Sequence, residues 1–205
     1  MTETKKPYLI LDLDETIIHS TSKEELAQFS SSDITKMKKD YKTHKMKGGY
    51  YTVAERPGLQ EFLDYAFENF TVSVWTAASK DYALFIIDEI VIAGKPEREL
   101  DWIFFSYHCD ISTRRCRSIK NLKLIWEMFN LEGYTPDNTV IMDDHPKVYK
   151  SQKENCIYMY PFQVEQGVDP DDDFLERLIP HLKMIHADIM NGKGVDTTSV
   201  NEQME

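Results

Sequence analysis

The segment from Leu9 to Thr16, which reads LILDLDET, constrains the fold of this chain more than any other part of the sequence. A short apolar run, typical of a buried strand, ends there in Asp12 and Asp14, which are two positions apart. The alternation of side chains relaxes where a strand gives way to a loop, so both carboxylates can reach one crevice. Open α/β sheets place their ligands beyond the carboxyl ends of the strands. We therefore predict an α/β fold with a polar site after its first strand.

Two carboxylates in one small pocket suit two kinds of chemistry. They can bind a hard cation such as Mg²⁺, and they can divide the work of a nucleophile and a general acid or base. The alternative is a pair of solvated turn residues, because aspartate is common where strands end. For this pair taken alone, both interpretations stay open.

Two later apolar segments end in polar residues in the same way. One predicted strand runs into Thr76, whose hydroxyl and following free N–H groups could hold a phosphate, although a plain helix cap is the alternative. Another runs into Asp143 and Asp144, adjacent carboxylates that repel each other unless a cation lies between them. An ordinary turn before Pro146 is the alternative there. His145 is expected to be a turn residue, since Mg²⁺ prefers oxygen ligands.

Strand-like and helix-like segments alternate along the chain. This order predicts a Rossmann-like, mainly parallel sheet with helices on both faces. The expected strands are 8–13, 50–53, 70–75, 102–107, 139–142 and 156–159, and the expected helices are 59–67, 79–93, 121–130 and 171–190.

A single domain over residues 1–190 is expected, because 205 residues are enough for one substantial core and few for two. Residues 20–49 and 94–118 are the predicted inserts. The first is rich in lysine and serine, with one weak helix near residues 23–29, and is too short and polar for a core of its own. Residues 191–205 are polar and are expected to form a frayed, flexible tail.

The charge and the cysteine content exclude several classes of protein. A net charge of −11 argues against general nucleic-acid binding, which needs clustered cations. Three cysteines favour a reducing compartment over a disulfide framework. The start of the chain lacks an apolar signal segment, and the apolar stretch from Tyr82 to Ala93 is too short and too charged to span a bilayer. We expect a soluble intracellular protein, in the nucleus or the cytosol, that binds no membrane.

Four motifs occur in the order of a known family. The run DLDETIIHS resembles the first motif of the haloacid-dehalogenase superfamily, and more narrowly that of the RNA polymerase II C-terminal-domain (CTD) phosphatases. VWTAAS resembles the second motif, and the adjacent aspartates resemble the fourth. SIKNLKLIW resembles the third motif of the branch that includes the ubiquitin-like-domain CTD phosphatase, which selects Lys120 rather than Lys123; a lysine before a helix is otherwise usually a solvated charge. Each motif alone is weak, but the ordered set, with the helix start RPGLQEFL, covers residues 7–162 and is strong.

The resemblance implies the haloacid-dehalogenase fold, with small inserts in place of a large cap. It also implies a Mg²⁺-dependent protein serine/threonine phosphatase that acts through an aspartyl-phosphate. The implied roles are nucleophile for Asp12, general acid/base for Asp14, phosphate binding for Thr76 and Lys120, support of the first loop for Thr16, and Mg²⁺ binding for Asp12, the Asp14 backbone carbonyl, Asp143 and Asp144.

The modest inserts favour an open site and a phosphorylated polypeptide as substrate, with the RNA polymerase II CTD as one candidate. Arg114, Arg115 and Arg117 could contact an acidic substrate, although arginines in a loop are more often only solvated. Two other functions stay open. One is a small-molecule phosphatase such as a nucleotidase, and the other is a non-catalytic protein-binding relative, against which the full set of site residues argues.

Overall fold

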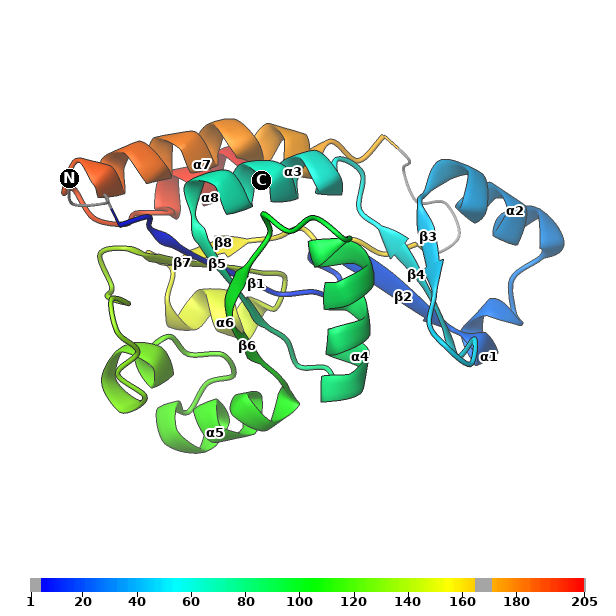
Figure 1. The fold of residues 1–205 in the computed structure, drawn as a ribbon, viewed down its shortest axis with the longest axis horizontal. Coiled ribbons are helices and arrows are strands. Elements are labelled where there is room, and N and C mark those ends of the chain that lie inside the picture. Colours follow the sequence, from blue (N-terminus) through cyan, green and yellow to red (C-terminus); the bar gives the residue numbers. More distant parts are fainter. Residues whose placement is uncertain (1–4, 165–170, 205) are drawn as a thin grey trace.

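A five-stranded parallel sheet forms the centre of the molecule (Figure 1). The computed structural model describes residues 5–164 and 171–204. The order of the strands is β6-β5-β1-β7-β8, and each neighbouring pair is parallel. This confirms the predicted fold class. The strands are β1 (Tyr8–Leu11), β5 (Thr71–Trp75), β6 (Leu100–Phe104), β7 (Thr139–Asp143) and β8 (Cys156–Tyr158).

The central strand β1 brings the later strand ends to one place. Tyr8 to Leu11 pair with residues 71–74 of β5 on one side and with residues 139–142 of β7 on the other. All four residues of β1 are buried, as expected of an apolar strand covered on both faces. Because the three strands are parallel and in register, the residues that follow them lie side by side at one edge of the sheet.

The alternating side chains of β1 divide the main core between the two faces of the sheet. Leu9 and Leu11 belong to one apolar cluster, and Tyr8 and Ile10 belong to another. Helices α3 (Leu59–Asn69), α4 (Lys80–Ile86) and α7 (Phe174–Met190) contribute to the first cluster, and α5 (Ser106–Cys116) and α6 (Pro146–Ser151) contribute to the second.

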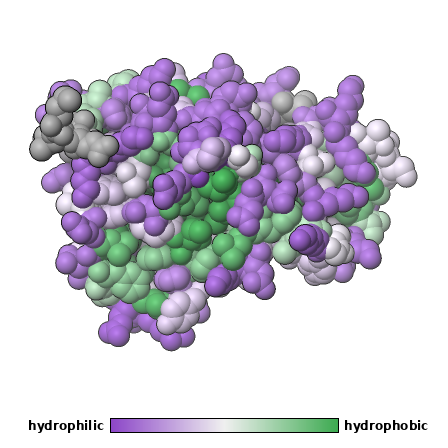
Figure 2. All heavy atoms as spheres, in the orientation of Figure 1, coloured by the Kyte–Doolittle hydropathy of each residue, from purple (hydrophilic) through white to green (hydrophobic). Residues whose placement is uncertain are grey.

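The coverage is thinner at β6, the edge strand. Trp102 and Ile103 in this strand are only half-buried. Figure 2 shows hydrophobic side chains in the middle of one face, beside β6 and α4, with hydrophilic side chains around them. The apolar surface of the sheet therefore reaches solvent at this edge.

Two of the predicted helices contain wider, π-helical turns. The helix expected over residues 79–93 is α4 followed by η1 (Ile87–Ile92), and it ends at Ala93 with a φ of 51°. The helix expected over residues 121–130 forms only η2 (Leu124–Met128). Apolar spacing predicts a helical face but does not separate α from π turns, which differ by one residue per hydrogen-bonded ring.

The first insert is more ordered than the sequence suggested. Residues 18–55 form a small antiparallel sheet of order β2-β4-β3 with two helices, seen at the right of Figure 1. Its members are β2 (Ile18–Ser22), α1 (Lys23–Leu26), α2 (Ser31–Asp40), β3 (Thr43–Lys45) and β4 (Tyr51–Glu55).

The insert is not wholly exposed, because two of its side chains are buried in a cluster that is shared with other segments of the chain. Met37 and Tyr41 are buried in a small cluster with Ala54, Phe162 and Val164. Two of these five side chains come from a segment more than 100 residues further along the chain. Local composition does not reveal partners at that distance, so the insert looked like an exposed loop.

The expectation of a frayed tail is also wrong. Residues 198–204 form helix α8 (Thr198–Met204), in which Val200, Asn201 and Met204 are buried. The Asn201 side-chain amide donates to the carbonyl oxygen of Cys156 (2.9 Å) and accepts from the backbone N–H of Tyr158 (2.8 Å). This helix therefore supplies partners to backbone groups of the edge strand β8, where no further strand of the sheet can bond them.

Some expectations from the sequence remain predictions. The division into one domain over residues 1–190 stays a prediction, and the first four residues lie outside the described ranges. In the described parts of the chain, no helix combines the length and the apolar character that crossing a bilayer requires. Cys109, Cys116 and Cys156 are free thiols.

Candidate active site

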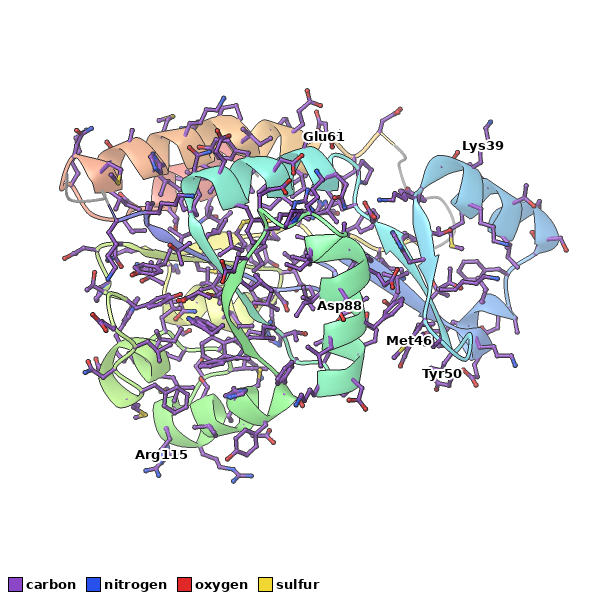
Figure 3. The ribbon with its side chains drawn as sticks, in the orientation of Figure 1. Lys39, Met46, Tyr50, Glu61, Asp88 and Arg115 are labelled. Carbon is purple, nitrogen blue, oxygen red and sulfur yellow. The ribbon has the colours of Figure 1, made fainter. Side chains whose placement is uncertain are left out.

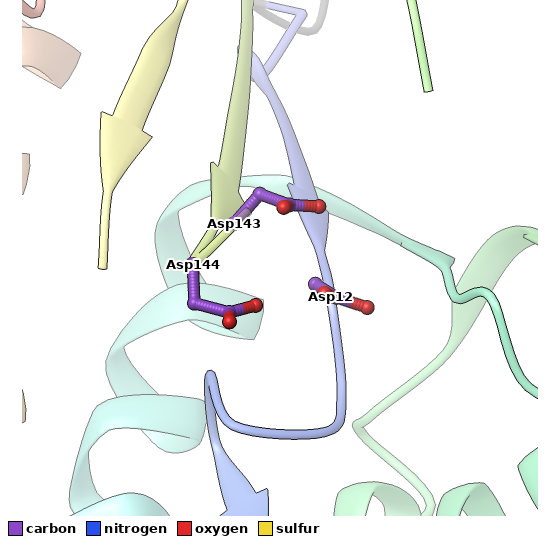
Figure 4. A group of neighbouring side chains, drawn as sticks. All are labelled: Asp12, Asp143 and Asp144. Carbon is purple, nitrogen blue, oxygen red and sulfur yellow. The ribbon is translucent and has the colours of Figure 1, made fainter. Parts of the chain in front are cut away.

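Three carboxylates meet where β1 and β7 end. Asp12 follows β1, Asp143 ends β7, and Asp144 comes next (Figure 4). One ligand atom from each of the three lies within 4.8 Å of the other two. Asp143 is fully buried, Asp12 is 6% exposed and Asp144 is half-buried. The parallel pairing of the two strands brings Asp12 and Asp143 together from positions 131 apart in the sequence.

Lys120 lies between two of these carboxylates. Its Nζ is 2.7 Å from Oδ1 of Asp12 and 2.7 Å from Oδ2 of Asp143. The side chain is almost completely buried, whereas Lys123 is exposed. Burial by itself lowers the pKa of Lys120, but the two carboxylates outweigh it and raise the pKa above its ordinary value. The two carboxylates therefore favour the charged form of Lys120 inside the site.

The backbone of Lys120 is held in an uncommon conformation. Its φ is 50°, in the left-handed region that few non-glycine residues adopt. Nε2 of Gln152 donates to the Lys120 carbonyl (3.0 Å), and the next N–H, of Asn121, donates to Oγ of Ser112 (2.8 Å). These bonds from α5 and the end of α6 hold the turn that positions Lys120. No sequence motif predicted them.

The charges of this cluster do not balance. Burial raises the pKa of Asp12 well above its usual value, against the opposing effect of Lys120. Burial, with the neighbouring Asp143, raises the pKa of Asp144 to about 6. Lys120 is the one lysine or arginine among the described residues that line the pocket, so three carboxylates share a single ammonium. The donor set of carboxylate oxygens and the excess negative charge fit a divalent cation such as Mg²⁺.

Asp14 lies in the turn between β1 and β2. The turn is closed by hydrogen bonds from the N–H groups of Ile17 and Ile18 to the carbonyl of Leu13 (2.9 and 3.2 Å). Oδ1 of Asp14 accepts a hydrogen bond from the hydroxyl of Tyr82 on α4. Burial raises the pKa of Asp14, and the bond from Tyr82 opposes this. The Asp14 carboxylate is outside the group of three, and metal binding by its backbone carbonyl stays a prediction.

Two threonines complete the site. Thr76, at the end of β5, is buried and lines the same pocket as Asp12 and Lys120. Its Oγ1 accepts from the N–H of Ala78 (3.0 Å), which is the bond expected of a turn cap. Oγ1 of Thr16 lies 3.4 Å from Oδ1 of Asp144. Thr16 therefore supports a carboxylate of the fourth motif as well as its own loop.

The pocket that these residues line is small. Its volume is about 150 Å³, whereas pockets for small-molecule ligands are usually about 300–1,000 Å³. It has room for a phosphoryl group and little more. The lining residues are Asp12, Asp14, Glu15, Thr76, Ala77, Ile119, Lys120, Asp144, His145 and Val148.

The predicted arginine cluster does not lie in this pocket. Arg114 and Arg115 are on helix α5, and not in a loop as expected, while Arg117 follows the helix. Arg114 and Arg115 line a separate groove between α5 and η2. Figure 3 shows Arg115 extending from α5 away from the body of the molecule. Contact of these arginines with a substrate stays a prediction.

Two polar residues of the site were not predicted. Tyr82 lies on α4, and its hydroxyl lies against Asp14 and Ser20. Ser20 is in β2, inside the segment interpreted as an exposed insert. A tyrosine on an apolar helix and a serine in a polar segment are both ordinary, so no local pattern marked either residue.

A known family of phosphatases matches most of this chain. The family model described as NLI interacting factor-like phosphatase matches residues 7–192. A CTD phosphatase-like protein, 355R of Invertebrate iridescent virus 6, is 36% identical over 173 residues, which cover 83% of this chain and 93% of that protein. Nuclear envelope morphology protein 1 of Saccharomyces cerevisiae is 28% identical over 203 residues, covering 91% of this chain and 41% of that protein.

A solved structure is similar over almost the whole chain. It is that of Fcp1, described as an essential RNA polymerase II CTD phosphatase, with a TM-score of 0.57 and 21% identity. The match covers 93% of this chain and 53% of the Fcp1 chain, so the present chain spans about half of that structure. At this level of identity the similarity shows a shared fold.

Proposed function

The chain belongs to the NLI interacting factor-like phosphatase family, and on that premise we propose that it is a magnesium-dependent protein serine/threonine phosphatase. The predicted relation to the CTD phosphatase-like proteins is thereby confirmed. One observation carries the proposal. Lys120 holds the carboxylate of Asp12 in a pocket the size of a phosphoryl group, which Asp14 and Thr76 also line.

The proposed reaction has two steps. In the first, an oxygen of the Asp12 carboxylate attacks the phosphorus, the bond from phosphorus to the substrate oxygen breaks, and that oxygen takes a proton from Asp14. In the second, Asp14 takes a proton from water as the water oxygen attacks the phosphorus. The bond between phosphorus and Asp12 then breaks, inorganic phosphate leaves, and Asp12 is again a carboxylate.

The remaining residues stabilise the phosphoryl group. Lys120 offsets the charge that collects on the phosphoryl oxygens, and Thr76 can donate a hydrogen bond to one of them. The groups that would hold Mg²⁺ are the carboxylates of Asp12, Asp143 and Asp144 and the backbone carbonyl of Asp14, and the ion would supply further positive charge to the site. Thr16 keeps Asp144 in place for this purpose.

The size of the pocket supports a polypeptide substrate. A phosphoserine or phosphothreonine presents its phosphate on a short side chain, so the rest of the substrate can stay outside a cavity of about 150 Å³. A nucleotide or sugar phosphate would leave its base or ring with little enclosing surface. The CTD of RNA polymerase II, which the name of the Fcp1 structure gives as that enzyme's substrate, is one candidate.

The substitution Asp12→Asn tests the nucleophile. We expect it to lower turnover of a phosphoserine peptide by at least about 10³-fold, because a neutral amide cannot attack phosphorus effectively. Asp137→Asn is the matched control, since Asp137 is an exposed aspartate outside the pocket. The far-UV circular dichroism of both variants should match that of the parent protein. Near-normal turnover by the Asp12→Asn protein would contradict the proposal.

A substrate panel separates the candidate functions. Phosphoserine and phosphothreonine peptides should have higher kcat/KM values than nucleoside monophosphates or sugar phosphates, with the flanking residues setting part of the difference. A preference for nucleotides over every peptide would indicate a small-molecule phosphatase. Absence of turnover on all of them, with Mg²⁺ present, would indicate a protein-binding relative without activity.

A further inference from the structure

We propose that Tyr82 and Ser20 position the carboxyl group of Asp14 for proton transfer to the leaving group. The inference rests on the proposed function, since it assigns a partner to the general acid of that reaction. The Tyr82 hydroxyl donates to Oδ1 of Asp14, and it lies at hydrogen-bond distance from Oγ of Ser20. The three side chains form one continuous chain of hydrogen bonds.

The direction of these bonds follows from the number of protons available. The hydroxyl of Tyr82 has a single proton, and an ionised Asp14 can only accept. Tyr82 therefore donates to Asp14, and the Ser20 hydroxyl donates to the oxygen of Tyr82. In this arrangement Ser20 keeps the Tyr82 proton directed at the carboxyl group.

The bond to Oδ1 determines which oxygen of Asp14 can carry the catalytic proton. When Asp14 is protonated, Tyr82 still donates to Oδ1, so the proton resides on Oδ2. The bond also restricts rotation of the carboxyl group about its last side-chain torsion, which is otherwise broad. A general acid held in one orientation transfers its proton more readily to an alkoxide that develops beside it.

Packing from two parts of the fold fixes the hydroxyl of Tyr82. The tyrosine is on α4, is only 8% exposed, and belongs to the main apolar cluster beneath the sheet. Its ring meets the ring of Tyr51, from β4, edge to face at a centroid distance of 5.3 Å. Ser20 belongs to β2, which pairs with β4. The small antiparallel sheet thus contributes to the orientation of Asp14.

The dependence of the rate on the leaving group tests this role. We compare Tyr82→Phe with the parent protein on a phosphoserine peptide, whose alkoxide must be protonated, and on 2,4-dinitrophenyl phosphate, whose phenolate leaves without a proton. The measured quantity is kcat/KM, because it includes departure of the leaving group and excludes hydrolysis of the aspartyl-phosphate.

The two substrates should respond differently. We expect Tyr82→Phe to lower kcat/KM for the peptide by about 10-fold or more, and for the aryl phosphate by less than about twofold, since general acid catalysis is worth about 10²–10⁴-fold in all. Ser20→Ala should act in the same direction with a smaller effect. Tyr51→Phe, which removes a hydroxyl from the neighbouring ring, is the matched control and should change neither value by more than about twofold.

Each other outcome overturns the inference. Equal losses on both substrates would show that Tyr82 acts only through the fold, and no loss on the peptide would show that Asp14 needs no partner. If Tyr82→Phe does not fold, an unchanged ratio of the two substrates in Ser20→Ala has the same meaning. Failure of the proposed function is distinguishable, because the parent protein would then hydrolyse neither substrate, or would do so without any effect of Asp12→Asn.

Discussion

The two sheets of the molecule maintain their structure in different ways. All four residues of β1 are buried, and the sheet around it is packed on both faces by two large apolar clusters. In β2 of the antiparallel sheet only two of five residues are buried, and the cluster beneath that sheet holds five side chains. The parallel sheet therefore has an extensive core. The antiparallel sheet adds Ile18 and Val53 to that core, and otherwise depends on a small cluster, two of whose members come from a distant segment.

The two sheets also supply different parts of the proposed active site. Asp12, Thr76 and Asp143 all follow or end strands of the parallel sheet, where dense packing can keep reacting groups within fractions of an ångström. The antiparallel sheet supplies Ser20, a residue one step removed from Asp14. Local opening of the smaller sheet would therefore change the orientation of Asp14, the proposed general acid, without displacing Asp12, the proposed nucleophile. Three experiments test this difference between the two sheets.

Removal of divalent cations should have the largest effect, and it should be confined to the parallel sheet. We expect excess chelator to abolish turnover, because Asp12, Asp143 and Asp144 are left with Lys120 as their only balancing cation among the described lining residues. Added Mg²⁺ should restore turnover and raise the melting temperature. At a free Mg²⁺ concentration of 100 times its dissociation constant, the free energy of unfolding should rise by about 2.7 kcal/mol. Full turnover in chelator would refute the metal assignment.

Truncation of one apolar side chain in each sheet compares the two cores. Leu9→Ala in β1 should lower the free energy of unfolding by about 3–5 kcal/mol, because Leu9 is fully buried in the main core. Met37→Ala in α2 should cost about 2 kcal/mol or less, at the low end for buried methionine, because its small cluster can open locally. Urea denaturation gives both values.

The matched control for this pair is Met184→Ala, since Met184 is 57% exposed; it should change stability by less than about 0.5 kcal/mol. Amide exchange adds a second reading of the comparison. In Met37→Ala the strands β2 to β4 should exchange faster while β1 stays protected. Equal destabilisation by Leu9→Ala and Met37→Ala, with equal loss of protection, would mean that the two sheets unfold as one unit.

The smallest loss of stability is expected at α8, a third region, which covers the edge strand β8 of the parallel sheet. Asn201→Ala leaves the Tyr158 N–H without a partner and removes one of the two side-chain donors to the buried Cys156 carbonyl, which should cost about 1–3 kcal/mol. Gln203→Ala, on an exposed position of the same helix, should cost less than about 0.5 kcal/mol. Thermal unfolding measures both. Indistinguishable melting temperatures would show that α8 does not support β8.

The sequence predicted the parallel sheet better than it predicted the surrounding helices. Strands such as β1 and β7 are continuous apolar runs, and burial on both faces produces that pattern almost without alternatives. The strands and helices of residues 20–49 have mixed polarity because one of their faces meets water. Helix α5 lies within residues 94–118, which the sequence predicts as an insert, although Cys109 and Ser112 in it are buried.

The same contrast holds within the site. Asp12, Asp14, Thr76 and Asp143 follow apolar strands, so their arrangement at one edge follows from the sheet that those strands must form. Lys120 was placed by resemblance, and its position between two carboxylates depends on a turn held by Ser112 and Gln152. No sequence pattern marked Tyr82 as a residue of the site, since a tyrosine in a helix is usually part of a core.

The class of the fold, the family and the strand-end residues that carry its motifs could thus be predicted from the sequence alone. These depend on short-range patterns, in which apolar runs and the polar residues after them are adjacent in the chain. Contacts between distant segments became visible only in the folded chain: the burial of Met37 and Tyr41 against Phe162, the docking of α8 on β8, and the bond from Tyr82 to Asp14. Such contacts form only when the whole chain is packed, because each partner alone is an ordinary residue with several equally favourable environments.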